Sequence, residues 1–331
     1  MKKIQMARRA LVAGVLGWAA MTPVWAASVS METATANSVV GLMPQSMAPI
    51  WAKNGVDVQL AMGQTLTKSL LKLTDGSLDV AVVPPPAYAD LKGGKGPYAK
   101  MGEKGVAAAA QVRSLWGFSA SSYHPIVWAD SGITDWSKIA GKRVYVGPPA
   151  GAANAQIMGL IERASGYKAG KDYEPIKSPW GAAPQGFQDG QYDVVFISAA
   201  PGASAVTEIA LSRPIRILSM PDGAAPPSDL GMVVSSIPKD TYKGQVNSDK
   251  AVNTWQTVMM VMAKATLSDD MAYKLTKTYM ESRKALSQGN ALLKQLPTDN
   301  PFGGVIAPLH PGAVKYYKEA GISIPAELLP K

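Results

Sequence analysis

One short pattern occurs twice in this chain and restricts its fold more than any other feature. Residues 75–80 and 189–194, which lie 114 positions apart, both read Asp-Gly-x-x-Asp-Val. Each copy describes a turn, an acidic strand start and an apolar run, followed by small residues and proline at 84–87 and 199–202. Any α/β protein contains strands of this kind, but the shared residues favour two lobes of similar construction.

The rest of the chain alternates between strand-like and helix-like segments. We predict strands at 56–60, 78–83, 144–146, 215–218 and 232–234, an apolar run at 252–263, and helices at 66–73, 153–164 and 268–287. Continuous apolar strands that alternate with helices are typical of parallel sheets covered on both faces. The expected fold class is therefore α/β, with two mostly parallel sheets flanked by helices and a hinge between the lobes.

A Gly/Pro/Ala-rich stretch at 221–227 reads as a linker or crossover. We place the two hinge crossings near 123–128 and 220–227. Lobe 1 then comprises residues 27–125 plus 225–331, because the Pro/Gly-rich tail is expected to return to it. Lobe 2 comprises residues 126–224.

The first 26 residues have the pattern of a secretory signal peptide. A basic start with Lys2, Lys3, Arg8 and Arg9 precedes an apolar stretch at 10–20, and a small residue, Ala26, ends the segment. A membrane anchor is the alternative, but this stretch is far shorter than the roughly 20 residues that a span requires. We expect cleavage after Ala26 and a soluble protein in the periplasm.

Charge and cysteine content exclude several classes of protein. The expected signal carries four of the nine net positive charges, and the remaining lysines are scattered, so no nucleic-acid partner is expected. The chain contains no cysteine, which excludes disulfides, thiolate metal sites, a cysteine nucleophile and a lipid anchor on cysteine. We expect a monomer.

No catalytic set of residues is recognisable. The two histidines, His124 and His310, lie 186 positions apart and have no metal-ligand spacing, and no Gly-x-Ser-x-Gly elbow is present. His310 is expected to open the last helix, with a catalytic role as the alternative. Asp269 and Asp270 follow Ser268, where helix capping explains them better than a metal does. We therefore expect no enzyme, no cofactor and no metal.

Candidate ligand-binding groups remain, and they lie in loops that follow predicted strands. The loop after 144–146 consists of Gly, Pro and Ala and leads into a helix, so that a small anion could contact its backbone N–H groups. Trp116, Trp128 and Trp180 are either cleft walls or core residues. The predicted ligand-binding residues are Gly63, Gln64, Thr65, Thr67, Pro85, Gly147, Pro148, Ala150, Gly151, Ala152, Asn154, Trp180, Ala200, Pro201 and Gly202.

An ordered set of motifs resembles the TAXI-type solute receptors of TRAP transporters (tripartite ATP-independent periplasmic transporters). The matching segments cover nearly the whole chain after the signal and are Gly63-Gln64-Thr65, 75–81, 130–133, 141–149, 187–195, 309–313 and 316–321. The resemblance implies a periplasmic binding protein fold, type II-like, that closes by a hinge motion on a small organic acid between the Gly63 and Gly147 loops. It also implies membrane permease subunits as the partner.

Two other functions stay open at this point. A periplasmic sensory module that binds a ligand and contacts a signalling receptor would have the same fold and the same cleft. An enzyme on the same fold is the third possibility, and turnover abolished by replacing His124 or His310 would support it.

Overall fold

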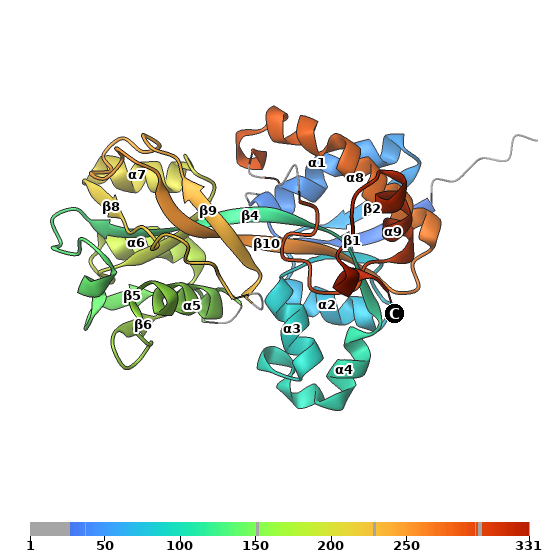
Figure 1. Ribbon diagram of the computed structural model, residues 1–331, viewed down its shortest axis with the longest axis horizontal. Helices are drawn as coiled ribbons and strands as arrows, with labels where there is room; N and C mark the ends of the chain where they lie inside the picture. Colours follow the sequence, from blue (N-terminus) through green and yellow to red (C-terminus); the bar gives the residue numbers. More distant parts are fainter. Residues whose placement is uncertain are drawn as a thin grey trace, which may run out of the picture.

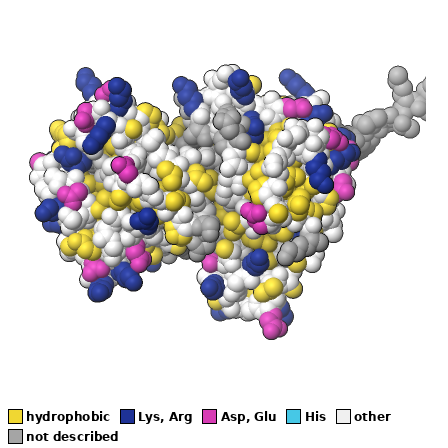
Figure 2. All heavy atoms as spheres, in the orientation of Figure 1, with side chains coloured by type: hydrophobic (Ala, Val, Ile, Leu, Met, Phe, Trp, Pro, Cys, Tyr) yellow, Lys and Arg dark blue, Asp and Glu magenta, His cyan; other side chains and the backbone are white. Residues whose placement is uncertain are grey.

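The computed structural model describes residues 27–36, 38–149, 152–227, 230–294, 296 and 300–330 (Figure 1). The segment 1–26, for which we predict a cleaved signal, lies outside these residues, as do Ala150 and Gly151 of the predicted ligand loop. Within the described ranges, no helix combines the length and the apolar character needed to cross a membrane. Figures 1 and 2 show two lobes joined by a narrower middle, which confirms the two-lobed α/β fold.

The elements alternate along the chain. The strands are β1 (Ala27–Glu32), β2 (Val56–Ala61), β3 (Val80–Val83), β4 (Val112–Trp128), β5 (Arg143–Tyr145), β6 (Glu174–Ile176), β7 (Val195–Ala199), β8 (Ile215–Ile217), β9 (Met232–Ile237) and β10 (Val252–Lys264). The helices are α1 (Val39–Lys53), α2 (Leu66–Thr74), α3 (Pro85–Gly93), α4 (Glu103–Ala109), α5 (Ala153–Ser165), α6 (Ala183–Gln188), α7 (Ser204–Ser212), α8 (Asp269–Gly289) and α9 (Pro311–Glu319). Each strand and helix predicted from the apolar pattern coincides with an element of the same type.

The two long strands β4 and β10 run through both lobes and hold them together (Figure 1). In lobe 1, β1 is parallel to β2 and β3, and β10 continues the sheet antiparallel to β3. In lobe 2, β5 is parallel to β6, whereas β7 and β8 are antiparallel to β4 and β9 is antiparallel to β10.

The sheet differs in one respect from the expected pair of mostly parallel sheets. β1–β2, β1–β3 and β5–β6 are parallel, but a continuous eight-stranded sheet links the lobes through antiparallel pairs. The reason is geometric: the chain enters lobe 2 along β4 and returns along β10, so these neighbouring strands must run in opposite directions.

Buried apolar residues form one large cluster and two smaller ones. The large cluster draws on residues 29–120 and 260–328, and the smaller ones draw on residues 123–255. Met220 and Ala224 belong to a cluster of lobe 2 that also contains Val146 and Trp255, and the chain runs back into lobe 1 along β10. The predicted lobe limits stay a prediction, because β4 and β10 contribute to clusters on both sides.

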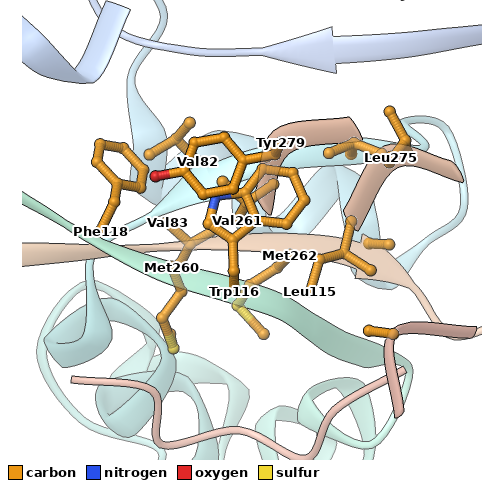
Figure 3. Packing of buried hydrophobic residues seen from close by; sticks show 14 of the residues in the cluster. Val82, Val83, Leu115, Trp116, Phe118, Met260, Val261, Met262, Leu275 and Tyr279 are labelled. Carbon is orange, nitrogen blue, oxygen red and sulfur yellow. The ribbon is translucent and has the colours of Figure 1, made fainter. Parts of the chain in front are cut away.

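An aromatic stack holds β4 against the helices of lobe 1 (Figure 3). The rings of Trp116 and Tyr279 are 4.5 Å apart and nearly parallel at 12°, and Trp51 lies 6.3 Å from Trp116. Such a pair contributes about 1 kcal/mol beyond its burial. In lobe 2, Trp128 stacks on Phe187 at 4.3 Å. Trp116 is therefore a core residue, whereas Trp128 is partly buried and packs against a core cluster of lobe 2.

Candidate functional site

The carboxyl ends of strands from the two lobes face each other across the middle of β4. Val83, the last residue of β3, pairs with Met260 of β10, which in turn pairs with Gly117 of β4. Ala199, the last residue of β7, pairs with Ser122 of β4. These two levels are five residues apart on β4, about 17 Å of extended chain. In open α/β sheets, ligands bind outside the carboxyl ends of strands. The loops that leave β3 and β7 thus define the candidate site.

Polar side chains lie at this level on strands that are otherwise mostly apolar. Gln256 Nε2 donates to Ser119 Oγ at 2.9 Å, and Ser235 Oγ donates to Gln256 Oε1 at 3.4 Å. The hydroxyls of Ser122 and Ser235 are 3.3 Å apart. Sequence reasoning missed these residues. The signal was the run Ser119-Ala120-Ser121-Ser122, which interrupts an apolar strand.

The first predicted loop, after β2, is tied to the loop after β1. The backbone N–H groups of Gly63 and Gln64 donate to the carbonyls of Ala34 at 3.1 Å and Thr33 at 2.9 Å. Gly63 has φ +72°, a conformation that glycine adopts without strain. Thr65 is exposed and precedes α2 without a capping bond from its hydroxyl. Its hydroxyl and the first N–H groups of α2 are therefore open to another acceptor or donor.

Two further side chains of this loop have internal partners or are partly covered. Gln64 Nε2 donates to the carbonyl of Met62 at 2.9 Å, so this amide helps to shape its own loop. Thr67 is half-buried, and its carbonyl accepts from the hydroxyl of Tyr98 at 2.9 Å.

The second predicted loop follows β5 and is shaped from within. Asn154 Nδ2 donates to the carbonyls of Val146 at 2.6 Å and Pro148 at 3.0 Å. Gly147 has φ +99°, and a Cβ there would lie 3.3 Å from Asn154 Nδ2. Asn154 is therefore a residue that holds the loop, in addition to any contact with a ligand. Ala152 precedes α5, and no side chain caps the first N–H groups of that helix.

The remaining predicted residues lie on three further loops. Pro85 is buried at the start of α3, and a Cβ on Gly231 would lie 2.7 Å from its Cβ, so its ring packs against the segment before β9. Trp180 is 38% exposed and lies edge-on to the ring of Tyr145 at 5.8 Å. Ala200 is buried and Pro201 half-buried, whereas Gly202 is exposed.

The helices that begin beside the candidate site differ in how their first N–H groups are used. Ser38 Oγ accepts from Gly41 N at the start of α1, and α3 begins with two prolines, which have no N–H. The loop before α7 donates Gly202 N–H to the hydroxyl of Tyr242 at 2.8 Å. The helices α2, α5 and α7 all begin without side-chain caps. An anion is stabilised at such a helix start by free N–H groups and by the helix dipole.

His310 and the acidic pair Asp269 and Asp270 have structural roles at helix starts. His310 Nδ1 accepts from Gly312 N at 3.2 Å and caps α9, which confirms that this residue opens the last helix. Ser268 Oγ accepts from Met271 N at the start of α8, which confirms the capping interpretation of Asp269 and Asp270. Burial lowers the pKa of His310 below its ordinary value. Within the described ranges, no three His, Asp or Glu side chains are grouped to hold a metal ion.

Two surface depressions in lobe 2 lie away from the candidate site. One, of about 260 Å³, is lined by residues 141 and 170–175, and the other, of about 290 Å³, by residues 129–130 and 213–214. Neither includes a predicted ligand residue. The concave surface relevant to the prediction is the indentation between the lobes, on the side of α3 and α5 (Figure 2).

Comparison with known proteins yields a family and a set of similar folds. The model of the NMT1-like family matches residues 34–321. The alkanesulfonate-binding protein SsuA from Xanthomonas axonopodis pv. citri, bound to MOPS, is 12% identical with a TM-score of 0.51, over 90% of this chain and 80% of that one. The periplasmic aliphatic sulphonate binding protein SsuA from Escherichia coli is 14% identical with a TM-score of 0.51, over 88% of this chain and 83% of that one.

Proposed function

We propose, from the premise that this chain belongs to the NMT1-like family, that it is a periplasmic solute-binding protein. It captures a small organic acid between its lobes and delivers it to a membrane transporter, for which we propose the permease subunits of a TRAP transporter. The observation that carries the proposal is the opposition of strand ends across the Gly117–Ser122 stretch of β4. A ligand held there contacts both lobes and so favours their closure.

The ligand class follows from the groups available on the two sides. Among the described residues, the starts of α2 and α5 have no side-chain cap, so their first N–H groups can donate to an anion. Thr65, Ser235 and Gln256 supply neutral hydroxyls and an amide. Such groups bind an anion more weakly than a bidentate arginine does, which suits reversible capture. Sulfonates, named for two similar structures, and carboxylates, implied by the TAXI resemblance, are both small organic acids.

The first test identifies what the protein carries. Protein secreted by its host and purified without refolding is analysed by native mass spectrometry, and we expect a bound small organic acid. Thermal unfolding with MOPS, taurine, L-glutamate and succinate then ranks candidate ligands, because a ligand at 100 times its Kd stabilises the fold by about 2.7 kcal/mol. No bound compound together with no stabilisation by any of the four acids would contradict the proposal.

The second test places a negative charge at the proposed anion seat. Thr65→Asp should leave the fold as stable as before, because aspartate is a good N-cap, yet weaken binding of the co-purified acid about tenfold or more through charge repulsion. Ser268→Asp makes the same kind of change at the start of α8 and should leave binding unaltered. Equal weakening in both variants, or in neither, would contradict an anion seat at α2.

A further inference from the structure

A buried chain of hydrogen bonds links the crossing strand β4 to the loop that leaves β7. His124 lies on β4 and is 0% exposed, and Tyr242 lies after β9 and is 2% exposed. Tyr242 Oη lies 2.9 Å from His124 Nε2, and Gly202 N–H donates to the same hydroxyl oxygen at 2.8 Å. The two rings are also packed edge to face, with centroids 5.6 Å apart.

The chemistry of the partners leaves one arrangement of protons. His124 Nδ1 faces two carbonyl oxygens, those of Ser122 at 3.1 Å and Ile197 at 3.3 Å, and carbonyls can only accept. The proton of the neutral imidazole is therefore on Nδ1, and Nε2 accepts from the hydroxyl of Tyr242. The oxygen of Tyr242 then remains to accept from Gly202 N–H. Every group in this chain of hydrogen bonds therefore has a partner.

The chain ends at a loop that belongs to the candidate site. Ala199 pairs with Ser122 at the end of β7, so residues 200–202 begin where β4 passes between the lobes. Gly202 is exposed and has φ +84°, and hence little side-chain packing holds it in place. The hydrogen bond from its N–H to Tyr242 ties it to a fully buried part of the protein.

We propose that Tyr242 is a positioning residue, which together with His124 holds the 200–202 loop to β4 in the orientation that ligand binding requires. This inference rests on the proposed function, because it assigns the loop to the ligand site. It adds a role for two side chains that do not contact the ligand themselves. Because His124 is part of β4, rotation of this strand between the lobes carries the loop with it.

The test removes the Tyr242 hydroxyl and nothing else. Tyr242→Phe keeps the ring against His124, and Tyr317→Phe is the matched control. Tyr317 is also fully buried, and its hydroxyl donates to the carbonyl of Leu115 at 2.9 Å in lobe 1. Hydrogen exchange at the Gly202 amide should accelerate about tenfold or more in Tyr242→Phe and stay unchanged in Tyr317→Phe, since the local opening free energy falls only at that loop. Nitrogen-15 NMR of the unaltered protein should report His124 as the Nδ1–H tautomer.

Binding of MOPS, measured by calorimetry, completes the test. Loss of the preorganised loop should raise the Kd for MOPS about fivefold in Tyr242→Phe and leave it unchanged in Tyr317→Phe. An Nε2–H tautomer, unchanged exchange at Gly202, or a looser loop with unchanged affinity would each overturn the inference. Failure of the unaltered protein to bind MOPS would count against the proposed ligand class, whereas the exchange and tautomer results would still decide whether Tyr242 positions the loop.

Discussion

In each lobe an aspartate just before a strand, Asp79 before β3 and Asp193 before β7, performs the same structural task. The carboxylate of Asp79 accepts from Ser30 N at 2.9 Å and pairs with Lys264 at 2.6 Å, which ties the start of β3 to β1. The carboxylate of Asp193 accepts from Arg143 N at 2.8 Å and from Arg143 Nη2 at 2.9 Å, which ties the start of β7 to β5. The repeated sequence pattern thus reflects one construction used twice.

The same two strands end in different ways. β3 leads into prolines, and Pro85 packs against Gly231 from the segment before β9. β7 leads into the loop whose Gly202 N–H is held by Tyr242 and His124. The two lobes are therefore alike at the starts of β3 and β7, where an aspartate ties each strand to its neighbour, and differ at the ends of these strands, which face the candidate site.

The largest expected effect comes from disturbing the contact between Pro85 and Gly231 that follows the end of β3. Gly231 has φ +59°, and a Cβ there would lie 2.7 Å from Pro85 Cβ and 2.8 Å from Pro86 Cδ. Gly231→Ala should lower the free energy of unfolding in urea by about 4 kcal/mol, because strain from a positive φ adds to overpacking. At Gly76, φ is +80° but no atom lies within 4 Å, so Gly76→Ala should cost only about 1 kcal/mol. Equal costs in the two variants would show that Pro85 does not pack tightly on this segment.

The polar connection at the end of β7 should make the protein sensitive to acid. Burial lowers the pKa of His124 from 6.5 to about 4. Between these values the unfolded chain binds a proton that the folded protein does not, so stability is complete above pH 6.5 and falls as the pH drops toward 4. The expected loss from this group is about 3 kcal/mol, measured by urea unfolding at several pH values.

His310 requires a control, because burial also lowers its pKa. His310→Asn keeps an N-cap on α9 and removes that titration. The variant should still lose stability between pH 6.5 and 4, through His124. A flat free energy of unfolding over this range would contradict a neutral, buried His124.

The smallest expected effect tests whether Asp79 and Asp193 stabilise their two lobes equally. Burial alone would raise the pKa of Asp79 and Asp193, but hydrogen bonds from Lys264 and Ser30 and from Arg143, respectively, hold both pKa values below the ordinary value. Asp79→Asn and Asp193→Asn should each lower the free energy of unfolding by about 2 kcal/mol at pH 7, the range for hydrogen bonds to charged groups. A cost confined to one variant would mean that the repeat is shared in sequence only.

Much of the architecture could be predicted because it depends on local patterns. The apolar run before Pro84 and the run after Asp193 are buried strands, and the spacing of Ile157, Leu160 and Ile161 identifies the buried face of α5. The cap at His310 follows from Pro311 and Gly312 alone. These features need only the preference of a short segment for a strand, a helix or a turn.

The return path of the chain could not be predicted in the same way. The Gly/Pro/Ala-rich segment 221–227 has the composition of a crossover, yet Ala224 O accepts from Trp255 Nε1 at 2.7 Å within lobe 2. The strand that crosses is β10, which is apolar along most of its length and reads like any buried strand. Which strand joins two lobes depends on pairing with distant strands, and composition does not record it.

The sequence by itself determined the α/β class, the two-lobed plan and the positions of the Gly63 and Gly147 loops, which are proposed to hold the ligand from opposite sides. Each of these depends on short-range periodicity and turn chemistry. Only the tertiary structure decided that Asn154 shapes its own loop, that Gln256 and the serines of β4 lie between the lobes, and that Tyr242 reaches His124 across 118 positions of sequence. The physical reason is the large separation in sequence between the interacting residues. A side chain's partner at such separations is set by how strands pair and layers pack, and the residues on either side of it carry no trace of that choice.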